Sequence, residues 1–136
     1  MTTTASPRRN GLAIAAGALR CASGVSFLIS PAAANRFWGD HEEPGVTTSL
    51  LLRSMGYRDA LVGGLLLRSG LRGDPETSQW FLASAGADAA DLLGGIANHS
   101  QMTPSQRRRG LGGAVVGIGL GVVGAIRARR RVVAVR

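Results

Sequence analysis

The sequence contains no lysine, one cysteine and few aromatic residues. All sixteen basic residues are arginines, set against eight acids, and aromatic residues make up 4% of a chain that is 45% hydrophobic. A water-soluble core of this size normally draws on more bulky side chains. The single cysteine, Cys21, excludes an internal disulfide and a thiolate metal site, so we expect it to pack as a small helical residue.

The formal charge of +8 is compatible with nucleic acid, an acidic partner or an anionic membrane surface. Aromatic residues do not alternate with the arginines as they do in proteins that stack bases, so we expect no nucleic-acid binding. The sequence also lacks a Ser-His-Asp set, a Cys-His set and a glycine-rich phosphate loop. It therefore gives little support to an enzyme and indicates no cofactor.

Four apolar segments divide the chain, and each is close to the ~20 residues that span a bilayer. They are residues 11–30, 46–67, 78–98 and 110–126, joined by short polar connections that each contain a proline. This pattern predicts one all-α domain over residues 1–136, an integral membrane four-helix bundle that crosses the cell membrane several times. Residues 127–136 are predicted to form a basic tail, and a soluble basic helical protein is the alternative.

Glycines in the apolar segments predict close helix packing. A glycine costs a water-exposed helix about 1 kcal/mol relative to alanine. In lipid the helix backbone must stay hydrogen-bonded, so glycines are better tolerated there. In the last segment glycine recurs every fourth residue, which predicts a smooth strip for another helix, a membrane-protein partner or a second copy. The glycines assigned to helix packing are Gly56, Gly63, Gly64, Gly113, Gly117 and Gly121.

The distribution of arginines predicts the orientation. The positive-inside rule favours both termini in the cytoplasm, with the run at residues 107–109 as an objection. A cleaved signal peptide is the alternative for the N-terminal segment, but Arg20 interrupts the region where small residues should precede cleavage. The arginines placed inside are Arg8, Arg9, Arg68, Arg72, Arg127, Arg129, Arg130, Arg131 and Arg136.

Charged residues also lie in the middle of the apolar segments. If each segment is centred on the membrane, Arg20, Arg58, Asp59 and Asp88 share one level, and Arg53 and Asp91 lie about a turn away on the same side. Each such charge costs about 2.5 to 3.5 kcal/mol at mid-helix. We therefore expect the first three helices to assemble as a unit and the last to insert independently. The predicted polar seam contains Arg20, Arg53, Arg58, Asp59, Ser84, Asp88, Asp91 and His99.

The seam has two interpretations. In the first it fixes the helix arrangement of a structural or accessory subunit. In the second it binds or conducts a small solute, a quinone or a proton. A metal site is a poorer interpretation, because Asp88, Asp91 and a distant His99 form a weak ligand set.

The stretch RSMGYRDALVGGLLL, residues 53–67, carries a family resemblance. Its Gly56, Arg58-Asp59 and Gly63 resemble small bacterial membrane proteins grouped as domain-of-unknown-function family 4267 and their DoxX-like relatives, and DAADLLGG in the third segment fits the same pattern. The resemblance implies a four-helix protein of the bacterial inner membrane and carries over no catalytic residue. DoxX-like relatives are linked to redox or quinone-associated complexes, so it also implies an accessory role.

Overall fold

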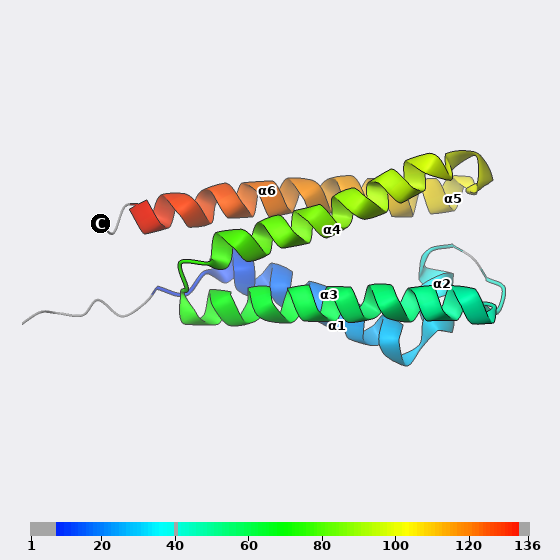
Figure 1. The fold of residues 1–136 in the computed structure, drawn as a ribbon, viewed down its shortest axis with the longest axis horizontal. Coiled ribbons are helices and arrows are strands. Elements are labelled where there is room, and N and C mark those ends of the chain that lie inside the picture. Colours follow the sequence, from blue (N-terminus) through cyan, green and yellow to red (C-terminus); the bar gives the residue numbers. More distant parts are fainter. Residues whose placement is uncertain (1–7, 40, 134–136) are drawn as a thin grey trace, which may run out of the picture.

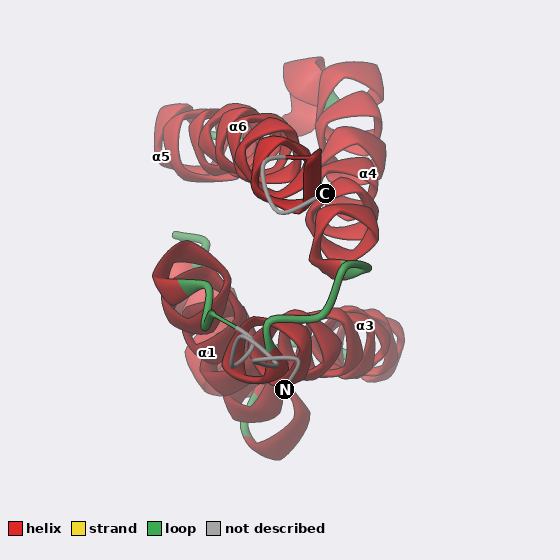
Figure 2. Ribbon diagram, turned by 90° about the vertical axis from the view of Figure 1, so that its left-hand side faces the viewer, coloured by secondary structure: helices red, strands yellow, loops and turns green. Residues whose placement is uncertain are grey.

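The computed structural model describes residues 8–39 and 41–133, and within these ranges it contains helices and loops but no strand. Four long helices form two antiparallel pairs. The first pair is α1 (Gly11–Ile29) with α3 (Val46–Arg72), and the second is α4 (Thr77–Ala97) with α6 (Gly112–Val133). One pair lies on the other in both views (Figures 1 and 2). The predicted all-helical class is confirmed.

Local sequence determines where these helices begin and end. The Asn10 side chain accepts a hydrogen bond from the Ala13 N–H and caps α1. Pro31 cannot continue α1 and begins the short α2 (Pro31–Phe37). Gly73, at φ +67°, supplies the left-handed conformation that ends α3.

The helix boundaries differ from the prediction in three places. Helix α2 lies in the first predicted loop, and α3 continues past the expected residue 67 to Arg72. Helix α6 runs through most of the predicted 127–136 tail to Val133, and residues 134–136 lie outside the described residues. The extensions at the ends of α3 and α6 are rich in arginine, which is a good helix former, so the loss of hydrophobicity there does not end the helix.

Short helical segments connect the second pair at its far end. They are η1 (His99–Gln101), and α5 (Pro104–Gln106) and η2 (Arg107–Leu111), which run without a break into α6. Thr103 and Gln106 form a capping box that begins α5.

The α1/α3 pair packs backbone against backbone through glycines. A Cβ on Gly56 would lie 2.7 Å from the Gly24 carbonyl oxygen, and Gly63 would meet the backbone at Cys21 in the same way. Gly17 faces the backbone of Leu67, whereas Gly64 makes only ordinary contact with the Cys21 sulfur. Gly56 and Gly63 therefore lie where the two backbones approach closely, and Gly64 does not.

The α4/α6 pair uses two of the three glycines predicted for the last segment. A Cβ on Gly121 would lie 2.7 Å from the Ala85 Cβ, and Gly117 leaves room for the Asp88 side chain. A Cβ on Gly113 would meet no atom within 4 Å, and this residue is exposed. The strip thus faces α4 of the same chain, and α6 packs along α4.

All four long helices meet near the α3–α4 connection. Leu66 and Phe81 are almost fully buried there, together with Ala13, Ala125 and Ala128. Away from this end the two pairs diverge (Figure 1).

Two helical stretches, Gly11–Ile29 and Pro104–Arg131, are long and apolar enough to cross a membrane by length and composition. Apolar side chains also remain exposed on every long helix, among them Leu19, Leu61, Leu93 and Val116. Large exposed apolar surfaces are typical of membrane or protein interfaces.

Candidate functional site

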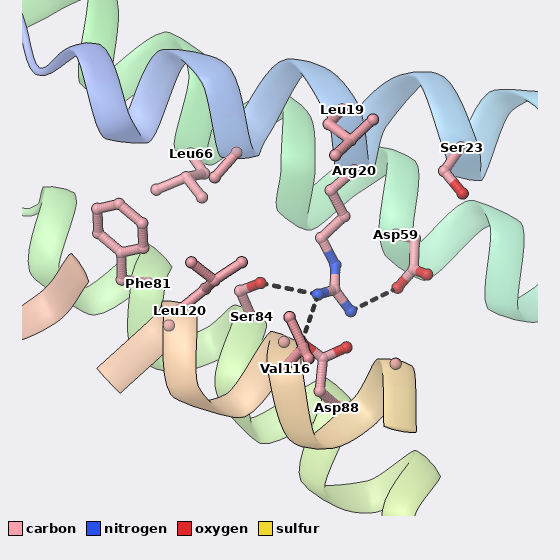
Figure 3. Close-up of a pocket in the computed structure, with 14 residues that line it drawn as sticks. Leu19, Arg20, Ser23, Asp59, Leu66, Phe81, Ser84, Asp88, Val116 and Leu120 are labelled. Atoms are coloured by element: carbon pink, nitrogen blue, oxygen red, sulfur yellow. Dashed lines mark hydrogen bonds and ion pairs between the residues drawn. The ribbon is translucent and has the colours of Figure 1, made fainter. Parts of the chain in front are cut away.

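Arg20 lies at the centre of a polar network between the two helix pairs. Its Nη1 donates hydrogen bonds to Ser84 Oγ at 2.8 Å and to Asp88 Oδ2 at 2.9 Å, both on α4. Its Nη2 donates to Asp59 Oδ1 on α3 at 2.9 Å. Figure 3 shows this guanidinium extending from α1 between the two carboxylates. One side chain therefore connects α1 to its own partner helix and to the opposite pair.

Arg58 makes the second connection between the pairs. Its Nη1 and Nη2 donate to the two oxygens of Asp91 on α4, at 2.8 and 2.7 Å. Its Nε donates to Asp59 Oδ1 at 3.1 Å. Two parallel hydrogen bonds between a guanidinium and a carboxylate combine charge attraction with fixed geometry, so this is the strongest single contact of the network.

The network is an alternating chain of charges. In order it runs Asp91, Arg58, Asp59, Arg20 and Asp88, with adjacent members joined by ion pairs of 2.7 to 3.1 Å. The side chains of Arg20, Asp59 and Asp88 are less than one-fifth exposed, whereas those of Arg58 and Asp91 are about three-tenths exposed. Buried charges require such pairing because desolvation of an isolated ion is costly.

Two predicted seam residues lie outside the network. Arg53 is exposed and makes no ion pair with any residue that the structure describes, so its expected match with Asp91 is not found. His99 is exposed in η1, and its backbone oxygen accepts hydrogen bonds from Arg107 Nε at 3.1 Å and from the Met102 N–H at 3.3 Å. The structure brings together the other six, which are Arg20, Arg58, Asp59, Ser84, Asp88 and Asp91.

A cavity of about 320 Å³ lies beside the network. Arg20, Asp59, Ser84 and Asp88 form its polar wall. The rest of the lining is mostly apolar, with Leu19 from α1 and Val116 and Leu120 from α6, as Figure 3 shows. The Arg20 Nε in the polar wall is buried and has no hydrogen-bond partner among the described residues.

A second cavity, of about 490 Å³, lies on the other side of the network where the pairs diverge. Asp91 and Asn98 contribute polar atoms, while Leu51, Met55 and Leu111 are part of the apolar lining. Trp38, whose buried indole N–H has no partner among the described residues, also lines it.

The functional interpretation of the seam predicts a cavity walled by Ser84, Asp88, Asp91 and His99, but the sequence does not predict two cavities or their apolar lining. Their walls use ordinary leucine, valine and methionine residues, which periodicity assigns to any helix face. Only the charged residues gave a signal, because charges in an apolar segment are rare. Within the described part of the chain, no three His, Cys, Asp or Glu side chains form a group that could hold a metal ion.

The fold and the site define a class, an all-helical protein with two candidate membrane spans and an ion-pair network between its helix pairs. Within this class the chain belongs to the family described as domain of unknown function (DUF4267), whose profile matches residues 17–126. This match over most of the chain confirms the family assignment, and it includes every residue of the network. No curated protein and no solved structure matches the chain.

Proposed function

We propose that this chain is an integral protein of the bacterial cell membrane whose four long helices span the bilayer. The two candidate spans support this, as do the exposed apolar side chains on α3 and α4. Helix α3 carries Arg58 and Asp59 near its middle, and the network pairs both with charges from other helices. This pairing offsets the insertion cost of about 2.5 to 3.5 kcal/mol for each charge.

The role that the geometry supports best is structural, in a membrane accessory protein. The observation that carries it is the position of Arg20, which bonds Asp59 within its own pair and Asp88 in the opposite pair. Because Gly117 and Gly121 are used inside the α4/α6 pair, a membrane partner would bind elsewhere. The exposed face of α3 around Leu50, Tyr57 and Leu61 offers such a surface.

A charge exchange tests the structural role. We expect Asp88→Arg alone to reduce the amount of folded protein in membranes severalfold, because it places a cation against Arg20. Combining it with Arg20→Asp should restore much of that amount, since the pair is re-formed with its charges exchanged. Folded protein is measured by size-exclusion chromatography of detergent extracts from carbonate-washed membranes.

Asp74→Arg, in the loop between α3 and α4, is the matched control and should accumulate like the wild type. Normal accumulation of Asp88→Arg would overturn the structural role. Release of the wild-type chain by carbonate would overturn membrane insertion.

A second function is the binding of a small molecule in the 320 Å³ cavity. The specific observation in its favour is that charged groups of the network line a space that is otherwise apolar. Sites for small molecules combine apolar walls with a few placed polar groups in this way. A solute, a quinone or a transferred proton would use the same wall.

A further inference from the structure

The network carries one negative charge more than its arginines neutralise. It contains two arginines, Arg20 and Arg58, and three aspartates, Asp59, Asp88 and Asp91. The third arginine that the sequence placed at this depth, Arg53, points away and is exposed. The balance expected from the sequence is therefore absent in the fold. In a medium of low dielectric an unbalanced charge is strongly disfavoured, so the network favours a cation from outside the chain.

The excess charge is concentrated at the Asp88 end of the chain of ion pairs. Asp91 has both oxygens engaged by Arg58. Asp59 Oδ1 accepts from two guanidinium groups. Asp88, in contrast, contacts only one guanidinium, through Oδ2. Asp88 Oδ1 accepts no hydrogen bond from the described residues and is not among their fully buried polar atoms.

Asp88 and Asp59 both line the 320 Å³ cavity. In Figure 3 their carboxylates lie on either side of the Arg20 guanidinium, and each keeps one oxygen outside the dashed contacts. Asp88 thus brings a carboxylate oxygen without a hydrogen-bond partner to the wall of a cavity large enough for a small charged group. An ammonium carries three donors and can donate one of them to this oxygen.

The remaining walls of the cavity continue to the outer surface of the helices. Leu19, Val116 and Leu120 line the cavity and are 75%, 62% and 52% exposed, so they reach the surface that faces lipid in a membrane-embedded chain. An inorganic cation would gain nothing from these side chains, whereas an alkyl chain would bury against them. The cavity is therefore suited to a molecule with a polar head and an apolar tail.

We propose that this cavity binds an amphipathic amine, with its ammonium group against Asp88 beside the Arg20 guanidinium and its alkyl chain along Leu19, Val116 and Leu120. The inference rests on the second function above, that the cavity takes a small molecule in a membrane-embedded chain. Binding one ammonium makes the network neutral. Asp88 is the principal contact for the ammonium, because its carboxylate accepts only one hydrogen bond from an arginine and the other aspartates accept two.

The test uses three probes of equal chain length and different charge, which are decylamine, decanol and decanoate. The full-length protein is reconstituted in phosphatidylcholine nanodiscs, and its thermal unfolding is followed with each probe at matched concentration. We expect decylamine at about one hundred times its Kd to raise the midpoint of unfolding by on the order of 10 °C, by mass action on the folded state. Decanol and decanoate should have much smaller effects.

Two variants locate the binding. Asp88→Asn removes the excess charge and should abolish the shift with decylamine, whereas Asp74→Asn makes the same change outside the cavity and should retain it. Val116→Trp leaves the network intact and fills the cavity from its exposed rim. It should also abolish the shift, so the test stands even if Asp88→Asn fails to fold.

Three outcomes would overturn the proposal. Equal shifts with decanol and decylamine would mean that Asp88 carries a proton and the cavity takes a neutral group. A decylamine shift that survives both Asp88→Asn and Val116→Trp would place binding elsewhere on the protein or in the lipid. The absence of any shift in a protein that resists carbonate extraction would reject the amine alone and leave the membrane assignment intact.

Discussion

Arg53 and Arg58 are the same residue type on the same helix, yet only Arg58 joins the network. At about 100° per residue, five residues rotate the side chain by about 140° around the helix axis. The two arginines therefore cannot both face α4. Arg58 binds Asp91 through two hydrogen bonds, whereas Arg53 is exposed and unpaired among the described residues.

This difference gives a prediction with an internal control. Arg58→Gln leaves Asp91 and part of Asp59 without a cation, and we expect it to lower the free energy of unfolding by about 2–4 kcal/mol, as for a broken buried ion pair. Arg53→Gln should change it by less than about 0.5 kcal/mol. Titration with a denaturing detergent, followed by circular dichroism, measures both. Similar losses at the two positions would show that the ion pair contributes no particular stability.

The same comparison shows how much of the site could be predicted from residues alone. Helix rise predicts that Arg20, Arg58, Asp59 and Asp88 share one level, and the structure joins these four side chains by ion pairs. Depth says nothing about which way a side chain points. Arg58 and Arg53 differ in their rotation around the helix axis and therefore in the helix that each side chain can reach. Periodicity does not predict which helices are neighbours.

At the level of helices, glycine spacing distinguishes the two pairs. In α1 and α3 the glycines at the contact recur every seventh residue, and the backbones approach there most closely. They are Gly17 and Gly24 in α1 and Gly56, Gly63 and Gly70 in α3. In α6 the contact instead uses Gly117, Gly121 and Gly124 against α4. Small residues at an interface allow this approach, and van der Waals packing and interhelical hydrogen bonds supply the attraction in lipid.

The glycine spacing of α6 predicts a packing surface, and the structure places α4 of the same chain against it. A glycine face predicts that another helix packs against it, but it does not identify that helix. Gly113 continues the four-residue spacing but lies beyond the contact with α4. Helix length and class follow from composition, whereas the pairing of helices depends on tertiary contacts that the pattern does not encode.

A pair of identical substitutions tests this assignment. Gly121→Ala places a Cβ 2.7 Å from the Ala85 Cβ and 2.8 Å from the Phe81 carbonyl oxygen, so α4 and α6 must separate. We expect a loss of about 1–3 kcal/mol in the free energy of unfolding. Gly113→Ala meets no atom within 4 Å and should stabilise α6 by up to about 1 kcal/mol.

Detergent titration of both variants, beside the wild type, gives the comparison. An unchanged free energy of unfolding for Gly121→Ala would mean that α4 and α6 are held apart in the membrane. Destabilisation by Gly113→Ala would mean that a further helix covers the exposed face of α6.

Considered as a whole, the molecule has two chemically different ends. The start of α1, the α3–α4 connection and the end of α6 lie together, since Asn10, Gly73, Asp74, Ala128 and Arg131 line one small cleft. This arrangement requires an even number of crossings if the long helices span a membrane. The described arginines near this end are Arg8, Arg9, Arg68, Arg72, Arg127, Arg129, Arg130 and Arg131. Those near the opposite end are Arg36, Arg107, Arg108 and Arg109.

The unequal distribution of arginines predicts that the first end faces the cytoplasm. Single cysteines test this in a Cys21→Ala background, because Cys21 is the only native thiol. Glu76 is exposed in the loop between α3 and α4, and Ser100 is exposed in η1 at the opposite end. A maleimide that does not cross membranes should label Ser100→Cys in intact cells, and label Glu76→Cys only after permeabilisation. The reverse pattern would invert the orientation. Labelling of both in intact cells would place the two ends on the same side, and the proposed four-span arrangement would then be wrong.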